Sequence, residues 1–199
     1  RKLMRAANLA PVNSVDNTVT PPGSKSITNR ALVCAAMADG TSNLTGVLDS
    51  EDTKVMIAAW QQLGIAIDWD RQARTALVQG CRGLFPNQTG DFYVANSGTT
   101  IRFLTAALAA GQGEFRLDGV PRMRQRPIAD LIDGLRQLGC HIESQNTLQP
   151  HCPPVHLLAR GLHGGTCRIA GNVSSQFLSG LMLAAPYARS TVHLEVTGE

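Results

Sequence analysis

Apolar residues form two kinds of helical segment along this chain. Three segments are apolar on nearly every side, and we expect helices covered all round at 31–37, 101–110 and 177–185. Two others, 50–63 and 127–138, keep their apolar residues on one face, which predicts helices at the surface. Short stretches with alternating apolar positions lie between the helices and indicate strands. The pattern predicts an α/β fold with buried central helices and mixed sheets.

The order strand, helix, strand, helix, strand, strand occurs more than once. It runs over about 21–80, again over about 91–160, and begins a third time at 165–199. Gln62-Leu63-Gly64 recurs as Gln137-Leu138-Gly139 at the ends of the two surface helices. A period of about 75 residues is too long for a solenoid and predicts a duplicated βαβαββ unit. By this period, the third unit lacks one helix and two strands.

Small polar residues precede each buried helix, and Pro21-Pro22-Gly23-Ser24 also ends an extended run that reaches Val19. Ser24 or Ser26 is placed to cap the first helix. If an approximate rotation relates the units, the three helix starts converge on one face. Free N–H groups and aligned helix dipoles would then attract a polyanion to that face.

Composition excludes several partners. A net charge of +3 without a basic run argues against nucleic acid, and no stretch is apolar enough for a bilayer or a signal peptide. Five cysteines without a Cys-x-x-Cys pair favour reduced thiols and a cytoplasmic protein. The crowded metal-ligand residues of 151–156 are a weak metal signal.

Candidate binding residues lie at the three expected helix starts. They are Lys25, Ser26 and Arg30 in the first unit, Asn96, Gly98, Thr99 and Arg102 in the second, and Ser174, Ser175 and Gln176 in the third. The loop 122–126 adds three arginines, whose forked guanidiniums suit phosphate or carboxylate. Simpler interpretations stay open: Arg124 and Arg126 in a solvated loop, and Arg102 bridged to a buried acid. Gly98 lacks a Cβ and lets a ligand approach the backbone.

Four motifs carry a resemblance to a known family. Pro22–Leu32, Asn96–Arg102, Pro121–Ile128 and Gly171–Leu178 are similar to the signatures of the 5-enolpyruvylshikimate-3-phosphate synthases, or 3-phosphoshikimate 1-carboxyvinyltransferases. The resemblance covers nearly the whole chain but about the first half of the family's length. It implies one lobe of the two-lobed enolpyruvyl transferase fold. Residues 1–20 would belong to the other lobe, and 21–199 would form a substrate-binding lobe.

The resemblance also implies an activity. The family transfers the enolpyruvyl group of phosphoenolpyruvate to the 5-hydroxyl of shikimate 3-phosphate, with release of phosphate, in the pathway to chorismate and the aromatic amino acids. The resemblance implies that neither a metal nor an organic cofactor is needed. By motif match, Lys25 would be catalytic and would contact both substrates. Phosphoenolpyruvate would also meet Gly98, Arg122 and Gln176, and shikimate 3-phosphate would meet Ser26, Arg30, Ser174, Ser175 and Gln176. Asn96, Thr99 and Arg102 would shape the site.

The rest of the family's length is expected to supply the acidic general base and further cations, so this chain alone should lack turnover. One alternative is a phosphosugar-binding lobe or half of a split enzyme. Another is the related UDP-N-acetylglucosamine enolpyruvyl transferase, which ordinarily has Lys-Asn where Lys25-Ser26 stands and a loop cysteine near Arg122. Because Gly98 leaves room beside phosphoenolpyruvate, sensitivity of the complete enzyme to glyphosate is also expected.

Overall fold

Helices and strands follow one another largely in the predicted order in the computed structural model, which describes residues 10–11, 14–172 and 174–198. The first unit contains α1 (Lys25–Met37), β1 (Thr41–Thr45), α2 (Glu51–Gln62), β2 (Ile67–Asp70) and β3 (Thr75–Gln79). The second contains β4 (Thr89–Tyr93), α3 (Gly98–Ala110), β5 (Gln112–Asp118), a 3₁₀ turn η1 (Met123–Gln125), α4 (Ala129–Gln137), β6 (His141–Ser144) and β7 (Val155–Arg160). The third contains β8 (Gly165–Ala170), α5 (Ser175–Ala184), η2 (Ala185–Tyr187) and β9 (Val192–Thr197).

Strand pairing confirms that the units repeat. The second unit forms a sheet in the order β4-β5-β7-β6, in which β4 and β5 are parallel and β7 runs antiparallel to β5. In the third unit β8 and β9 are parallel in the same way. The first sheet has the order β1-β3-β2, so within the described residues no strand takes the place that β4 has beside β5.

Serine caps fix where the helices begin. The hydroxyls of Ser24, Ser50 and Ser97 each accept a hydrogen bond from the amide three residues later, and Ser174 accepts from the amide of Gln176. At the other end, both surface helices are followed by a glycine in the left-handed region, Gly64 and Gly139, each with φ of 89°. These glycines end α2 and α4 in the same way, as the recurrence of Gln-Leu-Gly predicts.

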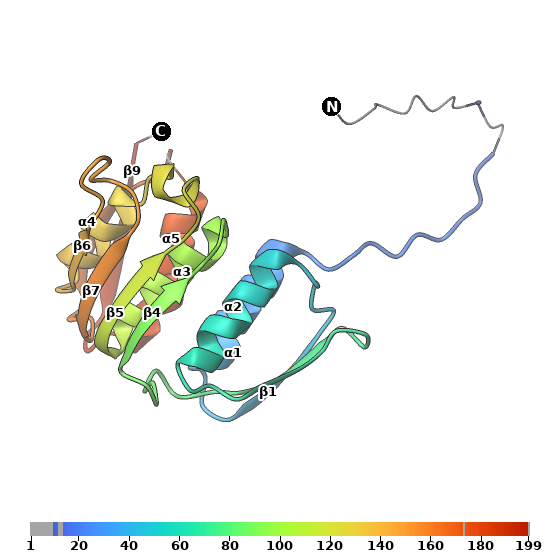
Figure 1. Cartoon of the computed structure of the whole chain (residues 1–199), viewed down its shortest axis with the longest axis horizontal. Helices are drawn as coiled ribbons and strands as arrows, with labels where there is room; N and C mark the ends of the chain where they lie inside the picture. The colour runs from blue at the N-terminus through green and yellow to red at the C-terminus, as the bar shows by residue number, and fades with distance from the viewer. Residues whose placement is uncertain (1–9, 12–13, 173, 199) are drawn as a thin grey trace.

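The helix α3 is the centre of the core. All thirteen of its residues are buried, as the apolar sequence predicts. It packs against α1 and α5, while α2 lies against α1 and α3, and α4 against α3 and α5. Figure 1 shows α1 beside α2 at one side of the molecule and α3 beside α5 behind the second sheet.

The prediction of complete coverage is wrong for α1 and α5. Cys34 on α1 is exposed, and Met182 on α5 is 59% exposed. The helix α2 packs between α1 and α3, and α4 packs between α3 and α5. By the same pattern, the repeat predicts a helix between α5 and α1. Within the described chain no helix takes that place, so one side of α1 and one side of α5 stay open.

Two boundaries also differ from the sequence prediction. Pro127 lies before α4 and does not open it, because Ile128 has non-helical angles and its amide donates to the carbonyl of His151. Val19 is 83% exposed and belongs to no strand, and the chain at 14–24 leads away from the body of the molecule (Figure 1). That residues 1–20 belong to another lobe stays a prediction, since residues 1–9 and 12–13 lie outside the described part.

None of the helices in the described ranges has the length and hydropathy needed to cross a membrane. All five cysteines are free thiols.

Candidate functional site

Side-chain hydrogen bonds tie the first turns of α1, α3 and α5 together. They are Asn29 Nδ2 to Thr99 Oγ1 at 2.7 Å, Arg102 Nη1 to Gln176 Oε1 at 2.8 Å, and Arg30 Nη2 to Ser179 Oγ at 2.9 Å. Each bonded residue lies within the first six residues of its helix. The prediction that three helix starts meet is therefore confirmed. We call this meeting point the helix-start site.

Arg102 is the buried cation of the helix-start site. Its residue is 8% exposed, and its guanidinium donates to the carbonyls of Gly98 and Pro127 and to the side chain of Gln176. Burial, with a smaller contribution from the nearby charge of Arg126, lowers its pKa to about 10. The alternative of a buried acid is wrong for the described chain, where these acceptors are all neutral. Arg102 Nε has no hydrogen-bond partner there.

The glycine turn before α3 is covered by a second guanidinium. A Cβ at Gly98 would overlap the Arg126 guanidinium and would come within 2.8 Å of Arg102 Nη1. Arg126 Nη1 also donates to the carbonyl of Asn96 at 3.0 Å. The space beside Gly98 is therefore held by a flexible side chain, which an anion can meet or displace. The interpretation of Arg126 as a solvated loop residue is therefore wrong, because its guanidinium bonds to the backbone of the glycine turn.

The arginine loop lies beside the same turn. The amide of Val120 donates to the carbonyl of Ala95, which anchors the start of the loop. Arg124 forms two bonds to the carboxylate of Asp118, at 2.9 and 2.7 Å, so it serves the loop's structure. Arg122 is exposed and precedes η1 without a side-chain cap bond. Its predicted contact with a ligand stays a prediction.

The first unit contributes Lys25, Ser26 and Arg30. Lys25 opens α1 with its side chain 49% exposed, and its Nζ lies 3.5 Å from Asp52 Oδ2. Arg30 donates to the carbonyl of Ser26 and lies over the ring of Phe103 at 4.9 Å. Arg30 is thus oriented by contacts that leave its charge without a carboxylate in the described structure.

The third unit contributes hydroxyls and an amide at the start of α5. Ser174 caps the helix, Ser175 is exposed, and Gln176 joins α5 to Arg102. Phe177 lies beneath the Arg102 guanidinium with 5.0 Å between the guanidinium carbon and the ring centroid. These contacts place the polar groups of α5 next to the cation of α3.

One residue of the site was missed by sequence reasoning. Asp52, in the first turn of α2, accepts hydrogen bonds from the hydroxyls of Ser97 and Thr99 and also faces Lys25. The sequence signal was weak, because acidic residues are common at the start of any helix.

Positive charge exceeds negative charge at the helix-start site. Arg30, Arg102 and Arg126 have no carboxylate partner in the described part of the chain, while Lys25 faces Asp52. The open N–H groups of three helices add partial positive charge. Such a site favours ligands with phosphate or carboxylate groups.

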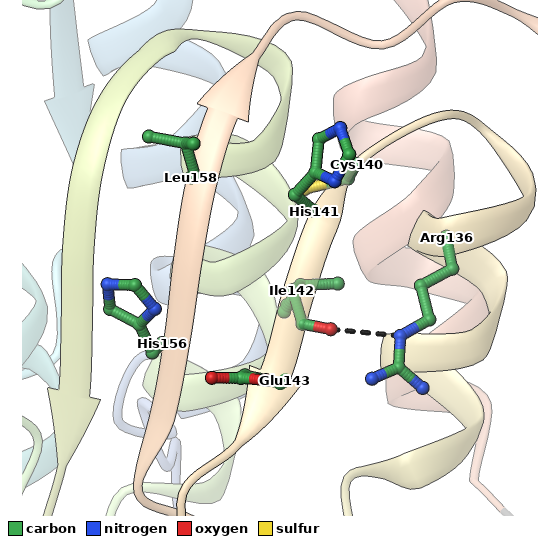
Figure 2. Close-up of a pocket in the computed structure, with 7 residues that line it drawn as sticks. All are labelled: Arg136, Cys140, His141, Ile142, Glu143, His156 and Leu158. Carbon is green, nitrogen blue, oxygen red and sulfur yellow. Dashed lines mark hydrogen bonds between the residues drawn. The ribbon is translucent and has the colours of Figure 1, made fainter.

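A separate hollow on β6 and β7 does not share these features (Figure 2). It is lined by Arg136, Cys140, His141, Ile142, Glu143, His156 and Leu158. Arg136 turns to the carbonyl of Ile142, and His156 Nε2 lies 2.9 Å from Glu114. Among the described residues no group of three or more His, Cys, Asp or Glu is arranged to hold a metal, and that includes the predicted weak cluster at 151–156.

Cationic side chains gather where the helices α1, α3 and α5 of this α/β lobe begin, and comparison with known proteins gives its family. Residues 9–198 match the model of EPSP synthase (3-phosphoshikimate 1-carboxyvinyltransferase). The 3-phosphoshikimate 1-carboxyvinyltransferase of Shewanella denitrificans is 43% identical over 98% of this chain, and the chloroplastic one of Petunia hybrida is 42% identical over 94%. The solved EPSP synthase of Acinetobacter baumannii superposes with a TM-score of 0.81 over 91% of the chain at 26% identity.

The chain therefore belongs to the EPSP synthase family. It spans 46% of the Shewanella relative, 38% of the Petunia relative and 40% of the solved Acinetobacter chain. The predicted family and the predicted lobe fold are confirmed.

Proposed function

We propose that this chain is the lobe of an enzyme that transfers the enolpyruvyl group of phosphoenolpyruvate to the 5-hydroxyl of shikimate 3-phosphate. The observation that carries the proposal is the buried guanidinium of Arg102, which faces neutral acceptors where three helix starts meet. Burial of a charge without a counter-charge is costly, so an anionic ligand is the natural complement of this site. Membership of the EPSP synthase family indicates that these anions are shikimate 3-phosphate and phosphoenolpyruvate.

The reaction needs cationic groups near both substrates. The 5-hydroxyl gives its proton to a base and its oxygen bonds to C2 of phosphoenolpyruvate while C3 gains a proton. The resulting tetrahedral intermediate then loses phosphate from C2 and a proton from C3. Negative charge moves on the carboxylate and phosphate during these steps, and fixed donors stabilise it without reorganising. In line with the family resemblance, we expect the reaction to need neither a metal nor an organic cofactor.

We assign the predicted site residues to the two substrates as follows, with Lys25 and Gln176 contacting both. Lys25 is proposed to contact both substrates and to assist proton transfer, with Gly98, Arg122 and Gln176 against phosphoenolpyruvate. Ser26, Arg30, Ser174, Ser175 and Gln176 would hold shikimate 3-phosphate. Support comes from the bonds that join α1 to α5 through Arg30 and α3 to α5 through Gln176. Asn96, Thr99 and Arg102 would keep these groups in place.

The chain alone is proposed to bind weakly and to lack turnover. A partner of about the same length, corresponding to the rest of the relatives' sequence, would supply an acidic base and exclude water by closing on this lobe. The binding-only alternative is half of a split enzyme or a phosphosugar-binding lobe. It is separated from the enzyme by whether the complementary half restores turnover.

Calorimetric titration of the chain with shikimate 3-phosphate tests the proposal. We expect binding that weakens about tenfold or more in Arg102→Met, because Arg102 holds the side chain of Gln176 and a lost bond to a charged group costs about 1.5–3 kcal/mol. Arg71→Met is the matched control, because Arg71 pairs with Asp49 outside the helix-start site. A folded wild-type chain without affinity, or equal affinity in Arg102→Met, would overturn the proposed site. Phosphate release by the chain alone would refute its inactivity.

A further inference from the structure

The carboxylate of Asp52 lies where the starts of α1, α2 and α3 meet. Its Oδ1 accepts hydrogen bonds from Ser97 Oγ at 2.7 Å and Thr99 Oγ1 at 3.2 Å, both at the start of α3. Its Oδ2 lies 3.5 Å from the Nζ of Lys25, at the start of α1. The two oxygens of one side chain thus reach two different helices.

The hydroxyls that Asp52 holds are themselves buried. Ser97 and Thr99 are 2% and 3% exposed, and they flank Gly98 on both sides. Asn29 of α1 donates to Thr99 from its other side, so Thr99 receives one bond and gives another to Asp52. The backbone carbonyl of Asp52 also accepts from Thr100 at 3.3 Å. These bonds fix the glycine turn against the start of α2.

An ordinary acid at a helix start does not make such contacts. Glu51, the preceding residue, is exposed and is the ordinary case, where a carboxylate favours the helix dipole. Asp52 has a side chain that is 19% exposed and bonds across 45 to 47 positions of sequence. Its pattern of contacts is that of a residue that positions other groups.

We propose that Asp52 is a positioning residue that holds the ammonium of Lys25 in register with the Gly98 turn. The inference rests on the proposed function, in which Lys25 and Gly98 both face phosphoenolpyruvate. Lys25 Nζ lies 3.5 Å from Asp52 Oδ2 with the lysine side chain 49% exposed, so Asp52 orients the ammonium while leaving it open to a ligand. The hydroxyl contacts are buried and keep Asp52 itself in place.

A positioning role for Asp52 and a purely electrostatic role predict opposite effects when the carboxylate is removed. If Asp52 were only a negative charge near the site, its removal would strengthen the binding of anions. If it positions Lys25, Asp52→Asn lowers kcat/KM by about tenfold, because small misplacements of a catalytic group are costly. The amide oxygen of asparagine still accepts from the two hydroxyls, so the fold is retained and the hold on Lys25 is lost.

The first measurement uses the chain itself and does not depend on turnover. The chain has three lysines, Lys2, Lys25 and Lys54, so ¹³C-lysine labelling gives spectra that a Lys25→Gln variant assigns. We expect separate signals for the two ε protons of Lys25 in wild type and in the control Glu51→Gln. In Asp52→Asn the two signals should merge. Unchanged Lys25 signals in a folded Asp52→Asn chain would overturn the positioning role.

The second measurement uses the chain completed by the other half of the family's length. Here kcat/KM should fall about tenfold in Asp52→Asn and stay within about twofold in Glu51→Gln. In a Lys25→Gln background, Asp52→Asn should add no further loss. Tighter binding of phosphoenolpyruvate with unchanged turnover in both acid variants would overturn the inference. Merged Lys25 signals together with an inactive wild-type complex would count against the proposed function and uphold the positioning.

Discussion

Replacement of Gly98 by alanine separates packing from ligand binding at the helix-start site. Gly98 is the first residue of α3, and its added methyl group would come within 2.8 Å of Arg102 Nη1 and would overlap the end of Arg126. Both neighbours are the far ends of long side chains. Arg126 can swing outward, whereas Arg102 is buried and bonded to Gln176.

The magnitude follows from two opposing effects. Alanine in a helix is favoured over glycine by about 0.5–1 kcal/mol. Loss of the Arg102–Gln176 bond costs about 1.5–3 kcal/mol, since one partner is charged. The net loss in the free energy of unfolding is therefore about 0.5–2.5 kcal/mol, or roughly 1–10 °C in Tm for a domain of this size. Affinity for phosphoenolpyruvate or glyphosate should fall more steeply, because the methyl group occupies the ligand's approach to the turn.

Urea denaturation and calorimetric titration measure the two quantities on one preparation. Gly134→Ala is the control: its methyl group would meet Leu181 Cδ1 at 3.1 Å and Cys167 Sγ at 3.3 Å, away from the helix-start site. It should change stability slightly and leave anion binding unaltered. Equal affinities of Gly98→Ala and wild type would refute steric control at Gly98. A stability loss well above 3 kcal/mol would show that the backbone, and not the arginines, has to move.

Two further predictions concern titrating groups. Burial is the largest single influence on the Asp118 carboxyl and raises its pKa, but the hydrogen bonds from Arg124 and the Gly119 amide, with the charges of Arg124 and Arg116, together outweigh it and lower the pKa overall. Asp118→Asn should therefore cost about 2 kcal/mol at pH 7, with the difference from wild type shrinking as pH falls below about 4, when wild type also loses the charge; urea denaturation across this pH range measures it. Burial raises the pKa of Cys140 to about 12, so a disulfide-exchange reagent at pH 8 should modify the exposed Cys34 first and reach Cys140 only after unfolding; rapid labelling of Cys140 in the native chain would contradict this.

Local features were well predicted because their causes lie within a few residues. Ser24 caps α1 through an amide three positions away, and Gly64 ends α2 through its own backbone angle. The burial of α3 also follows from composition, since a helix without a polar face has no side to offer to water.

Predictions about contacts between distant segments were less successful. The alternative in which Arg102 pairs with a buried acid was wrong. The sequence shows the charge of Arg102 but not the backbone carbonyls and the amide side chain that surround it. Asp52 was missed because its bonds to Ser97 and Thr99 span 45 and 47 positions. For α1 and α5, the apolar pattern shows which sides of each helix can be buried. Whether another helix covers those sides depends on how the units pack together.

The pairing of β9 has a practical consequence for work with this chain in solution. Within the described residues β9 bonds to β8 along one edge, and Val196 on it is 53% exposed. An unprotected strand edge that carries an apolar side chain is a template for adding strands from other molecules. Concentrated samples should therefore self-associate through β9, and a charged residue in place of Val196 is the simplest way to keep them dispersed.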